Sequence, residues 1–172
     1  VVATFLGVLA AQFKAELDRE RGRRQDVEAV AARFAANFVT YDYRSLDDSL
    51  ERIRDDATAK FGNEYERLFR TSVRTLITET KAQSRGTVTD VFVGELDDEA
   101  ANVLTVLNVE RQGISGRVPV AGTYLELALV RSGGTWKVDN VTAINSTQAG
   151  APPPGSGAPA APGATTTTSV AG

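Results

Sequence analysis

The stretch that decides the fold is residues 26–46, which read DVEAVAARFAANFVTYDYRSL. Apolar side chains recur in it at every third or fourth position: Val27, Val30, Ala31, Phe34, Phe38 and Tyr41. This spacing places them on one face of an α-helix. Asp26 stands just before the first of them, where a carboxylate can cap the free backbone N–H groups of a helix start. We therefore expect a long amphipathic helix whose apolar face is covered by the rest of the chain.

The helix is expected to end at a cluster of aromatic and charged side chains, namely Tyr41, Asp42, Tyr43 and Arg44. In a structural interpretation, Asp42 or Arg44 fixes the turn through charge-assisted hydrogen bonds, while one tyrosine fills the mouth of the fold. In a functional interpretation, an exposed tyrosine and Arg44 form a binding site for a protein partner, because Tyr and Arg dominate such sites. The sequence leaves both interpretations open.

Two shorter helices are predicted to follow. Ser45 and Asp48 have the spacing of a capping box at the start of the second helix. The apolar positions of this helix are Leu46, Leu50 and Ile53. After a break over residues 55–62, Asn63 is placed to cap a third helix. The buried face expected for the third helix consists of Tyr65, Leu68, Phe69, Ser72, Val73 and Leu76.

Beyond Gly86 the pattern changes to segments rich in Val, Thr, Leu and aromatic residues. Four strands are predicted, at residues 87–95, 101–111, 118–131 and 135–143. The turns between them are marked by Asp97-Asp98, by Gly113 to Gly116 and by Ser132-Gly133-Gly134. In the third strand Leu125, Leu127 and Leu129 alternate with Tyr124, Glu126 and Ala128. Short connections predict antiparallel pairing, and helices followed by strands predict an α+β fold with a curved four-stranded sheet.

The first 13 residues carry no charge and are almost wholly apolar. A bilayer-spanning helix needs about 20 such residues, so we expect residues 1–25 to comprise the C-terminal part of a transmembrane helix and a charged neck. An ordinary buried helix and a signal-peptide remnant are the alternatives. The arginines of the neck, within residues 14–25, favour a cytoplasmic side under the positive-inside rule, which opposes the external location adopted below.

The C-terminal residues have a different composition from the rest of the chain. Residues 146–172 contain five of the six prolines and neither aromatic nor charged residues. Such a segment buries too little apolar area to offset the entropy lost on ordering. The sequence therefore predicts three parts: the anchor and neck at residues 1–25, a globular domain at 26–145 and a disordered tail at 146–172.

The composition argues against several classes of function. The net charge is −3, from 19 basic and 22 acidic residues, and no basic stripe with interleaved aromatic residues indicates a nucleic-acid partner. Without cysteine or histidine the chain has no thiolate, no disulfide and no imidazole base or ligand. We accordingly expect no metal, no cofactor and no enzymatic activity.

Several segments resemble a known family. They are residues 40–53 (TYDYRSLDDSLERI), 61–69 (FGNEYERLF), 86–93 (GTVTDVFV) and 134–141 (GTWKVDNV). Over about residues 1–145 the chain resembles the Mce-associated membrane proteins of actinobacteria, and more widely the NTF2-like (SnoaL-like) superfamily of conical α+β domains. The resemblance implies a single transmembrane helix in the cytoplasmic membrane with the globular domain on its external, periplasmic side. It also implies an accessory role beside Mce transporter subunits, which carry lipids through the cell envelope.

An NTF2-like cone often holds a pocket between its long helix and its sheet. Candidate lining residues for a lipid or another small molecule are Phe34, Phe38, Tyr124, Glu126 and Trp136. Enclosed among apolar side chains, Glu126 would be suited to move protons, whereas on a solvated face it would have no such role. For Trp136, Phe34 and Phe38 the sequence favours the alternative interpretation, that they are ordinary core residues.

Three functions fit these expectations. The first is a non-catalytic, membrane-anchored accessory protein that stabilises a Mce-type lipid transport complex. The second is a carrier whose cone binds a lipid or small molecule. The third is an assembly module of a secretion or conjugation system, because VirB8-like proteins also combine one transmembrane helix with an NTF2-like domain.

Overall fold

The computed structural model describes residues 2–144, with side chains for residues 12–119 and 122–144. The predicted tail, residues 146–172, lies outside the described part of the chain. The elements run in the order α1 (Val2–Val39), β1 (Tyr41–Asp42), α2 (Leu46–Asp56), α3 (Ala59–Leu68), the π-helix η1 (Phe69–Val73), α4 (Arg74–Glu79), β2 (Gln83–Leu96), β3 (Ala100–Gly113), β4 (Gly116–Ser132) and β5 (Thr135–Ile144).

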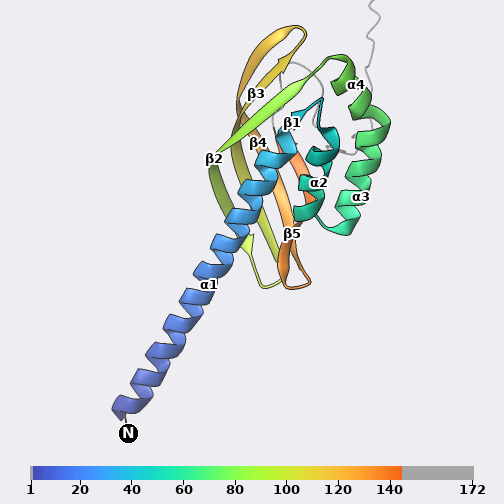
Figure 1. Ribbon diagram of the computed structural model, residues 1–172. Coiled ribbons are helices and arrows are strands. Elements are labelled where there is room, and N and C mark those ends of the chain that lie inside the picture. The colour runs from blue at the N-terminus through green and yellow to red at the C-terminus, as the bar shows by residue number, and fades with distance from the viewer. Residues whose placement is uncertain (1, 145–172) are drawn as a thin grey trace, which may run out of the picture.

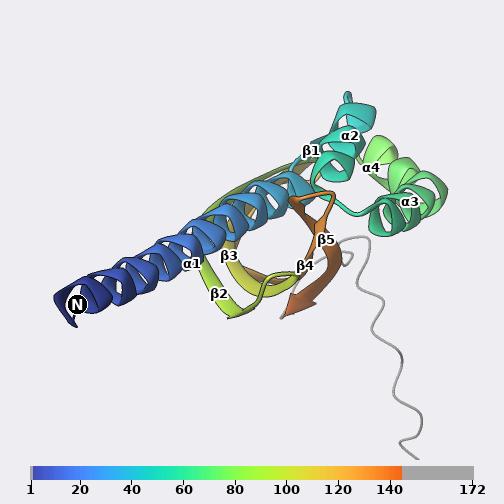
Figure 2. The same ribbon diagram turned by 90° about the horizontal axis from the view of Figure 1, so that it is seen from below.

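The strands form one antiparallel sheet with the order β1-β2-β3-β4-β5. The predicted α+β class and the predicted turns between the long strands are confirmed. The predicted count of four strands is wrong, because Tyr41 and Asp42 add a short edge strand opposite Ser84 and Gln83. Figures 1 and 2 show that the sheet curls into a half-barrel, with α1 across its open side and α2 to α4 packed at one end.

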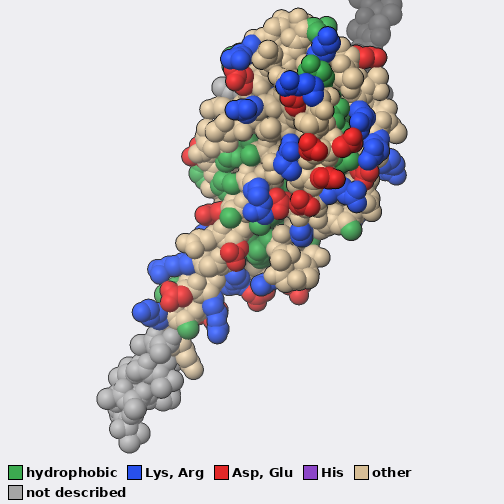
Figure 3. Space-filling view, in the orientation of Figure 1, with side chains coloured by type: hydrophobic (Ala, Val, Ile, Leu, Met, Phe, Trp, Pro, Cys, Tyr) green, Lys and Arg blue, Asp and Glu red, His purple; other side chains and the backbone are tan. Residues whose placement is uncertain are grey.

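Helix α1 belongs to both the domain and the segment that projects from it (Figure 1). Phe13 and Leu17 are 69% and 53% exposed, whereas Val27 is fully buried. Residues 14–21 are exposed helical turns with charges of both signs (Figure 3), whereas Gly22 and Arg23 are half-buried. The role of residues 14–25 as a neck below a membrane anchor stays a prediction. Asp26 does not cap a helix start, because α1 passes through it without interruption.

No helix among residues 2–144 is both long enough and apolar enough to cross a membrane. The first residues of the chain, which the sequence assigns to part of a transmembrane helix, form the N-terminal turns of α1. That assignment remains a prediction.

The core lies between α1 and the concave face of the sheet. Phe34 has no exposed surface, and Leu125 and Leu127 on β4 are equally buried. The predicted alternation on β4 is confirmed, since Glu126, between these leucines, is exposed. Each large apolar side chain buried in this way contributes roughly 1.5–3 kcal/mol to folding, so the α1–sheet interface is a major source of stability.

A column of aromatic rings extends this core from α1 to α3. The ring centroids of Phe34 and Phe38 are 5.7 Å apart, and those of Phe38 and Tyr65 are 5.5 Å apart. Phe61 meets Phe34 edge-on at 5.9 Å, and Tyr65 stacks on Phe69 at 5.9 Å. Offset and edge-to-face pairs of this kind add to the gain from burial alone. The column therefore binds α3 and η1 to α1.

The third predicted helix differs from expectation at its start. Thr58, not Asn63, is its N-cap, and the Thr58 hydroxyl accepts a hydrogen bond from the backbone N–H of Phe61 at 3.2 Å. The predicted break is present but shorter than residues 55–62, because α2 continues to Asp56 and α3 begins at Ala59. Asn63 consequently lies inside α3, on its exposed side.

The same helix differs again at its middle, where residues 69–73 form a π-helix. Leu68 and Leu76, which were predicted to be buried, are 38% and 48% exposed, whereas Ile77 is buried. In an α-helix, positions four apart drift by about 40° per step around the axis. The wider π-turn corrects this drift, so that Phe61, Tyr65, Phe69 and Ile77 stay on one buried line.

The capping box predicted for α2 is not formed. Ser45 is the N-cap, but its side chain makes no capping hydrogen bond. Its backbone N–H donates to the Asp42 carbonyl at 3.0 Å, and Ser49 donates both its N–H and its hydroxyl to the Ser45 carbonyl. Backbone contacts with the preceding turn therefore take the place of the predicted side-chain cap.

The end of α1 meets β2 at a close approach. Gly86 has no side chain at the point where a Cβ atom would overlap Cγ2 of Val39. The Gly86 N–H also donates to the Thr40 hydroxyl at 3.0 Å. Glycine at position 86 thus lets the end of α1 lie directly on β2.

We expect Gly86→Ala to lower the free energy of unfolding by about 1–3 kcal/mol, because Val39 is buried and has little room to move. Gly22→Ala is the matched control, since a Cβ at Gly22 in the exposed part of α1 meets nothing within 4 Å. The control should raise stability by about 0.5–1 kcal/mol. Urea denaturation monitored by circular dichroism measures both changes. Equal stabilities for the two variants would contradict the close approach.

Candidate interaction site at the β1 corner

The turn between α1 and α2 is held by Asp42. Its carboxylate accepts hydrogen bonds from Nε of Arg44 at 3.0 Å and from Nη2 of Arg44 at 2.6 Å. It also accepts from the backbone N–H of Arg44 at 2.9 Å and from the Gln83 side-chain amide at 3.1 Å. These are the charge-assisted hydrogen bonds that the structural interpretation of the corner expects.

The arginine of this pair has a second contact, with an aromatic ring. Its guanidinium carbon lies 5.6 Å from the ring centroid of Tyr43, within the range of a cation–π interaction. The Tyr43 N–H donates to the Ala82 carbonyl at 3.2 Å, which ties the corner to the start of β2. Tyr43 is half-buried and Arg44 exposed. Their role in binding a partner stays a prediction.

The electrostatics of the corner follow from these contacts. The hydrogen bonds from the Arg44 side chain and backbone hold the pKa of the Asp42 carboxyl well below its usual value of 3.8. On the inner side of the same strand, burial raises the pKa of the Tyr41 hydroxyl, and the positive charge of Arg111 partly opposes this rise. Asp42 is therefore a fixed negative charge, whereas Tyr41 remains a neutral phenol.

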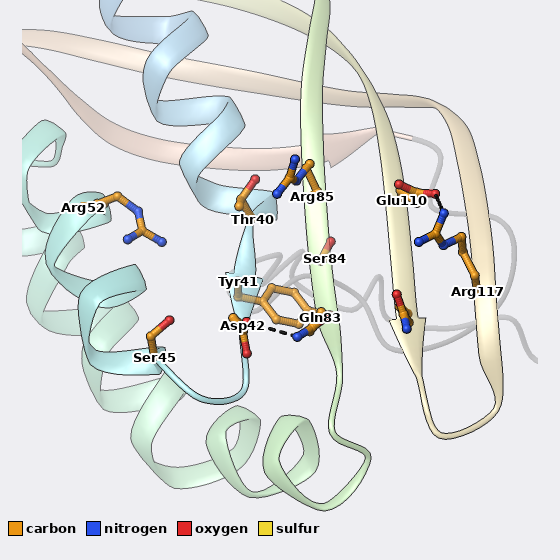
Figure 4. Close-up of a pocket in the computed structure, with 11 residues that line it drawn as sticks. Thr40, Tyr41, Asp42, Ser45, Arg52, Gln83, Ser84, Arg85, Glu110 and Arg117 are labelled. Atoms are coloured by element: carbon orange, nitrogen blue, oxygen red, sulfur yellow. Dashed lines mark hydrogen bonds and ion pairs between the residues drawn. The ribbon is translucent and has the colours of Figure 1, made fainter.

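A polar cleft with a volume of about 430 Å³ adjoins the corner (Figure 4). It lies where β1, the start of β2, the ends of the β3–β4 hairpin and α2 come together. The residues that line it are Thr40, Tyr41, Asp42, Ser45, Arg52, Gln83, Ser84, Arg85, Glu110, Gln112 and Arg117. The volume lies in the range of roughly 300–1,000 Å³ that is usual for ligand sites.

Strand register gathers most of this lining. Gln83 is opposite Gln112, which in turn is opposite Arg117. Arg85 is opposite Glu110 in the neighbouring row. Side chains opposite one another on antiparallel strands share a face of the sheet. Within the lining, Nη1 of Arg117 lies 3.0 Å from Oε1 of Glu110, so this arginine already has a carboxylate partner.

The five residues predicted to line an internal pocket are not brought together in one cavity. Phe34, Phe38 and Trp136 fill the core, with at most 5% of each side chain exposed. Tyr124 and Glu126 lie on the outer face of the sheet, half-buried and exposed respectively. The interpretation of the three aromatic residues as core therefore fits their positions better than the pocket interpretation.

Glu126 instead borders a second, shallow hollow on the outer face of the sheet. This hollow has a volume of about 350 Å³, and its most exposed apolar members are Phe92 and Ile144. The exposure of Glu126 agrees with the solvated position that the sequence left open. No group of three acidic side chains in the described residues is arranged to hold a metal ion.

Sequence reasoning identified the corner but not the arginines of the cleft. Arg52 and Arg85 lie on α2 and β2, more than 30 positions apart. Arg52 falls within residues 40–53, which carry the family resemblance, but the sequence analysis gave neither arginine a role. A signal was available for Arg85, because residues 83–86 continue the alternation of β2 four positions before the predicted start of that strand. Arg52 had no comparable signal, since only tertiary packing brings α2 to the sheet.

Comparisons with solved structures identify the fold. An IcmL-like type IV secretion system protein from Legionella pneumophila is similar at a TM-score of 0.59 and 14% identity, over 73% of this chain and 96% of that chain. The periplasmic domain of DotI is similar at a TM-score of 0.58 and 14% identity, over 70% and 94%. CagV, a VirB8 homologue from Helicobacter pylori, is similar at a TM-score of 0.55 and 10% identity, over 70% and 98%.

The fold is NTF2-like. At these identities the similarity establishes the architecture alone. A scan against protein-family models finds no match, and a search of curated proteins finds no relative. The predicted type of fold is thus confirmed, whereas membership of the NTF2-like superfamily and of the Mce-associated family stays a prediction.

The Asp42–Arg44 pair predicts a specific pH response. A carboxyl whose pKa is lowered on folding stabilises the fold above its usual pKa of 3.8, and this contribution is lost as the pH falls through the lower folded value. In Arg44→Gln, the pKa of Asp42 should move back toward 3.8, and this acid-dependent loss of stability should become smaller. Carbon-detected NMR titration of the Asp42 carboxyl measures the pKa directly.

Arg52→Gln serves as the control for this titration, because Arg52 lines the same cleft but makes no hydrogen bond to Asp42. It should leave the Asp42 midpoint close to that of the unsubstituted protein. If the titration midpoint of Asp42 is unchanged in Arg44→Gln, the hydrogen bonds from the Arg44 guanidinium do not lower the pKa of Asp42 in solution.

Proposed function

We propose that this protein is a non-catalytic, membrane-tethered assembly module of a multi-protein complex in the cell envelope. In this proposal α1 is the stem, and the globular domain lies on the external, periplasmic side of the cytoplasmic membrane. The domain serves as a docking point for other proteins and performs no chemistry itself.

The observation that carries the proposal is the continuity of α1. One helix of 38 residues, about 57 Å long, forms the projecting stem and also supplies the buried Phe34 stripe. Polar contacts fix the helix where it enters the domain. Arg23 pairs with Asp98 at the β2–β3 turn, and Nη1 of Arg24 donates to the Val93 carbonyl at 3.2 Å. A stem integral to the core holds the domain at a set height and orientation.

The structural comparisons support this assembly role over the other candidates. The similar structures are described as a type IV secretion system protein, as a periplasmic domain and as a VirB8 homologue. They favour a VirB8-like secretion or conjugation module over an accessory protein of a Mce transporter. The resemblance of residues 40–53 to Mce-associated proteins leaves Mce transporter subunits as the competing partners.

A carrier of lipid or another small molecule is the least supported alternative. The side chains nearest to the expected pocket, Phe34 and Trp136, are packed into the core. The cleft that the structure does show is polar and lies at the rim. A protein surface suits such a cleft better than an acyl chain.

The proposal is tested by purifying the full-length protein, tagged at its C-terminus, from membranes of its source organism in mild detergent. We expect envelope proteins to co-purify at fixed ratios, and mass spectrometry then distinguishes secretion subunits from Mce subunits. A matched control retains the anchor but replaces the domain with an unrelated periplasmic domain, and it should recover none of these proteins.

Topology provides an independent check. Alkaline phosphatase fused after Gly150 should be active, whereas a cytosol-dependent fluorescent reporter at the same position should be dark. Recovery of the protein alone, together with a reporter that works only in the cytosol, would contradict the proposal.

A further inference from the structure

Most arginines among the described residues have a carboxylate partner. Examples within the described residues are Arg33 with Asp56, Arg44 with Asp42, Arg54 with Glu66, Arg74 with Asp47 and Arg117 with Glu110. Arg52 and Arg85 differ from them. Both line the polar cleft, and no ion pair to either one occurs among the described side chains.

The two arginines have no acid available within the cleft. Asp42 is already occupied by Arg44 and Gln83, and Glu110 by Arg117. Among the described side chains, that of Arg52 donates only to the hydroxyl of Ser49, at 3.0 Å. Figure 4 shows the Arg52 side chain extending from α2 toward β1 and that of Arg85 beside Thr40. The cleft thus has two unneutralised positive charges in a chain whose net charge is −3.

Neutral donors lie on the same face of the sheet as Arg85. Side chains alternate along a strand, so Gln83 shares a face with Arg85, and Gln112 is opposite Gln83 on β3. Ser84 lies between Gln83 and Arg85, and its side chain faces the other way, opposite Tyr41 and Arg111. The cleft therefore offers donors and positive charge to a ligand with carboxylate oxygens.

We propose that the cleft binds an acidic segment of a partner protein, with Asp or Glu carboxylates bound to Arg52 and Arg85. This inference rests on the proposed assembly function and names the chemistry of its partner. The guanidinium fork matches a carboxylate through two parallel hydrogen bonds. Attraction between the exposed charges guides the acidic segment into the cleft.

The position of the cleft favours a protein over a membrane surface as the source of the anion. Thr40, in the cleft lining, directly follows the C-terminal end of α1. The opposite end of α1 is the one assigned to the membrane, about 57 Å away along the helix. This separation exceeds the Debye length at physiological salt, roughly 8 Å, several times over. Lipid headgroups at the stem are therefore out of reach of Arg52 and Arg85.

The test uses the 172-residue chain and a hexaglutamate peptide with blocked termini. Two-dimensional NMR follows the backbone amides and the Nε–Hε groups of Arg52 and Arg85 during titration. We expect saturable shifts of these two Nε–Hε signals, and weaker binding as the sodium chloride concentration rises. The double variant Arg52→Gln/Arg85→Gln should bind the peptide at least about tenfold more weakly.

The matched control removes the same charge elsewhere. Arg67→Gln/Arg131→Gln replaces two exposed arginines outside the cleft lining, and its affinity should stay within about twofold of the unsubstituted protein. Circular dichroism and thermal unfolding confirm that both double variants fold. Equal loss of binding in the two double variants would overturn the site, because the attraction would then be non-specific.

Two further probes identify the class of anion. Sodium phosphate and glycerol 3-phosphate represent a free phosphate and a lipid headgroup. If either shifts the Arg52 and Arg85 signals at lower concentration than hexaglutamate does, the acidic-segment proposal is overturned in favour of a phosphate site.

Co-purification separates this inference from the proposed function. Recovery of partner proteins with the unsubstituted chain, and their loss with Arg52→Gln/Arg85→Gln, is the expected result. Undiminished recovery with that variant overturns the acidic-segment site and leaves the assembly function standing. Failure of the unsubstituted chain to recover partners, despite saturable peptide binding, counts against the assembly function alone.

Discussion

The packing of Phe34 is the contact on which the rest of the structure depends. This side chain projects from α1 and has no exposed surface. It stacks on Phe38 of the same helix and meets Phe61 of α3 edge-on, so it joins two helices over the concave face of the sheet. A twisted antiparallel sheet curls readily around such a ridge. The side chains of α1 and of the sheet thus form the core inside the curve.

The same helix connects this core to the stem. Helix α1 contains no proline over its 38 residues, and its charged turns run directly into the Phe34 stripe. The stem and the cleft therefore lie toward opposite ends of one continuous helix. The contact of Arg24 with the Val93 carbonyl has a further effect, because it covers part of the free edge of β2. Covering a sheet edge opposes unwanted pairing with another strand.

The period of the apolar residues was sufficient to predict the features that lie within a single helix or strand. The apolar stripe around Phe34 and the alternation of Leu125 with Glu126 each have a period set by one element, and both appear as expected. Features that depend on contacts between elements were missed. Strand β1 is too short to show a period, and the π-turn over residues 69–73 follows from the need to keep one aromatic face on α1. The Thr58 cap was overlooked because Asn63 is an equally good capping residue by composition.

Only part of the candidate site could be predicted from the sequence, for the same reason. The corner was predicted because Asp42 and Arg44 are two residues apart, so their pairing is visible in the sequence. Arg85 meets Glu110 through strand register, and Arg52 approaches them only because α2 packs beside β1. The expectation of an internal pocket assumed that the cone encloses a cavity. Phe34, Phe38 and Trp136 are instead packed in the core, with at most 5% of each side chain exposed.

The position of α2 explains how Arg52 is presented to a ligand. Three ion pairs hold this short helix from different sides: Arg33 on α1 with Asp56, Arg74 on α4 with Asp47, and Glu66 on α3 with Arg54. Two of these pairs, Arg74–Asp47 and Arg54–Glu66, are exposed or partly exposed and contribute at most about 1 kcal/mol each, whereas Asp56 in the third pair is buried. Their collective effect is geometric, because an 11-residue helix restrained by three neighbours has little freedom to rotate. Arg52 therefore extends from a backbone that is already fixed, so ligand binding does not have to order α2. Such preorganisation lowers the entropic cost of binding a charged ligand.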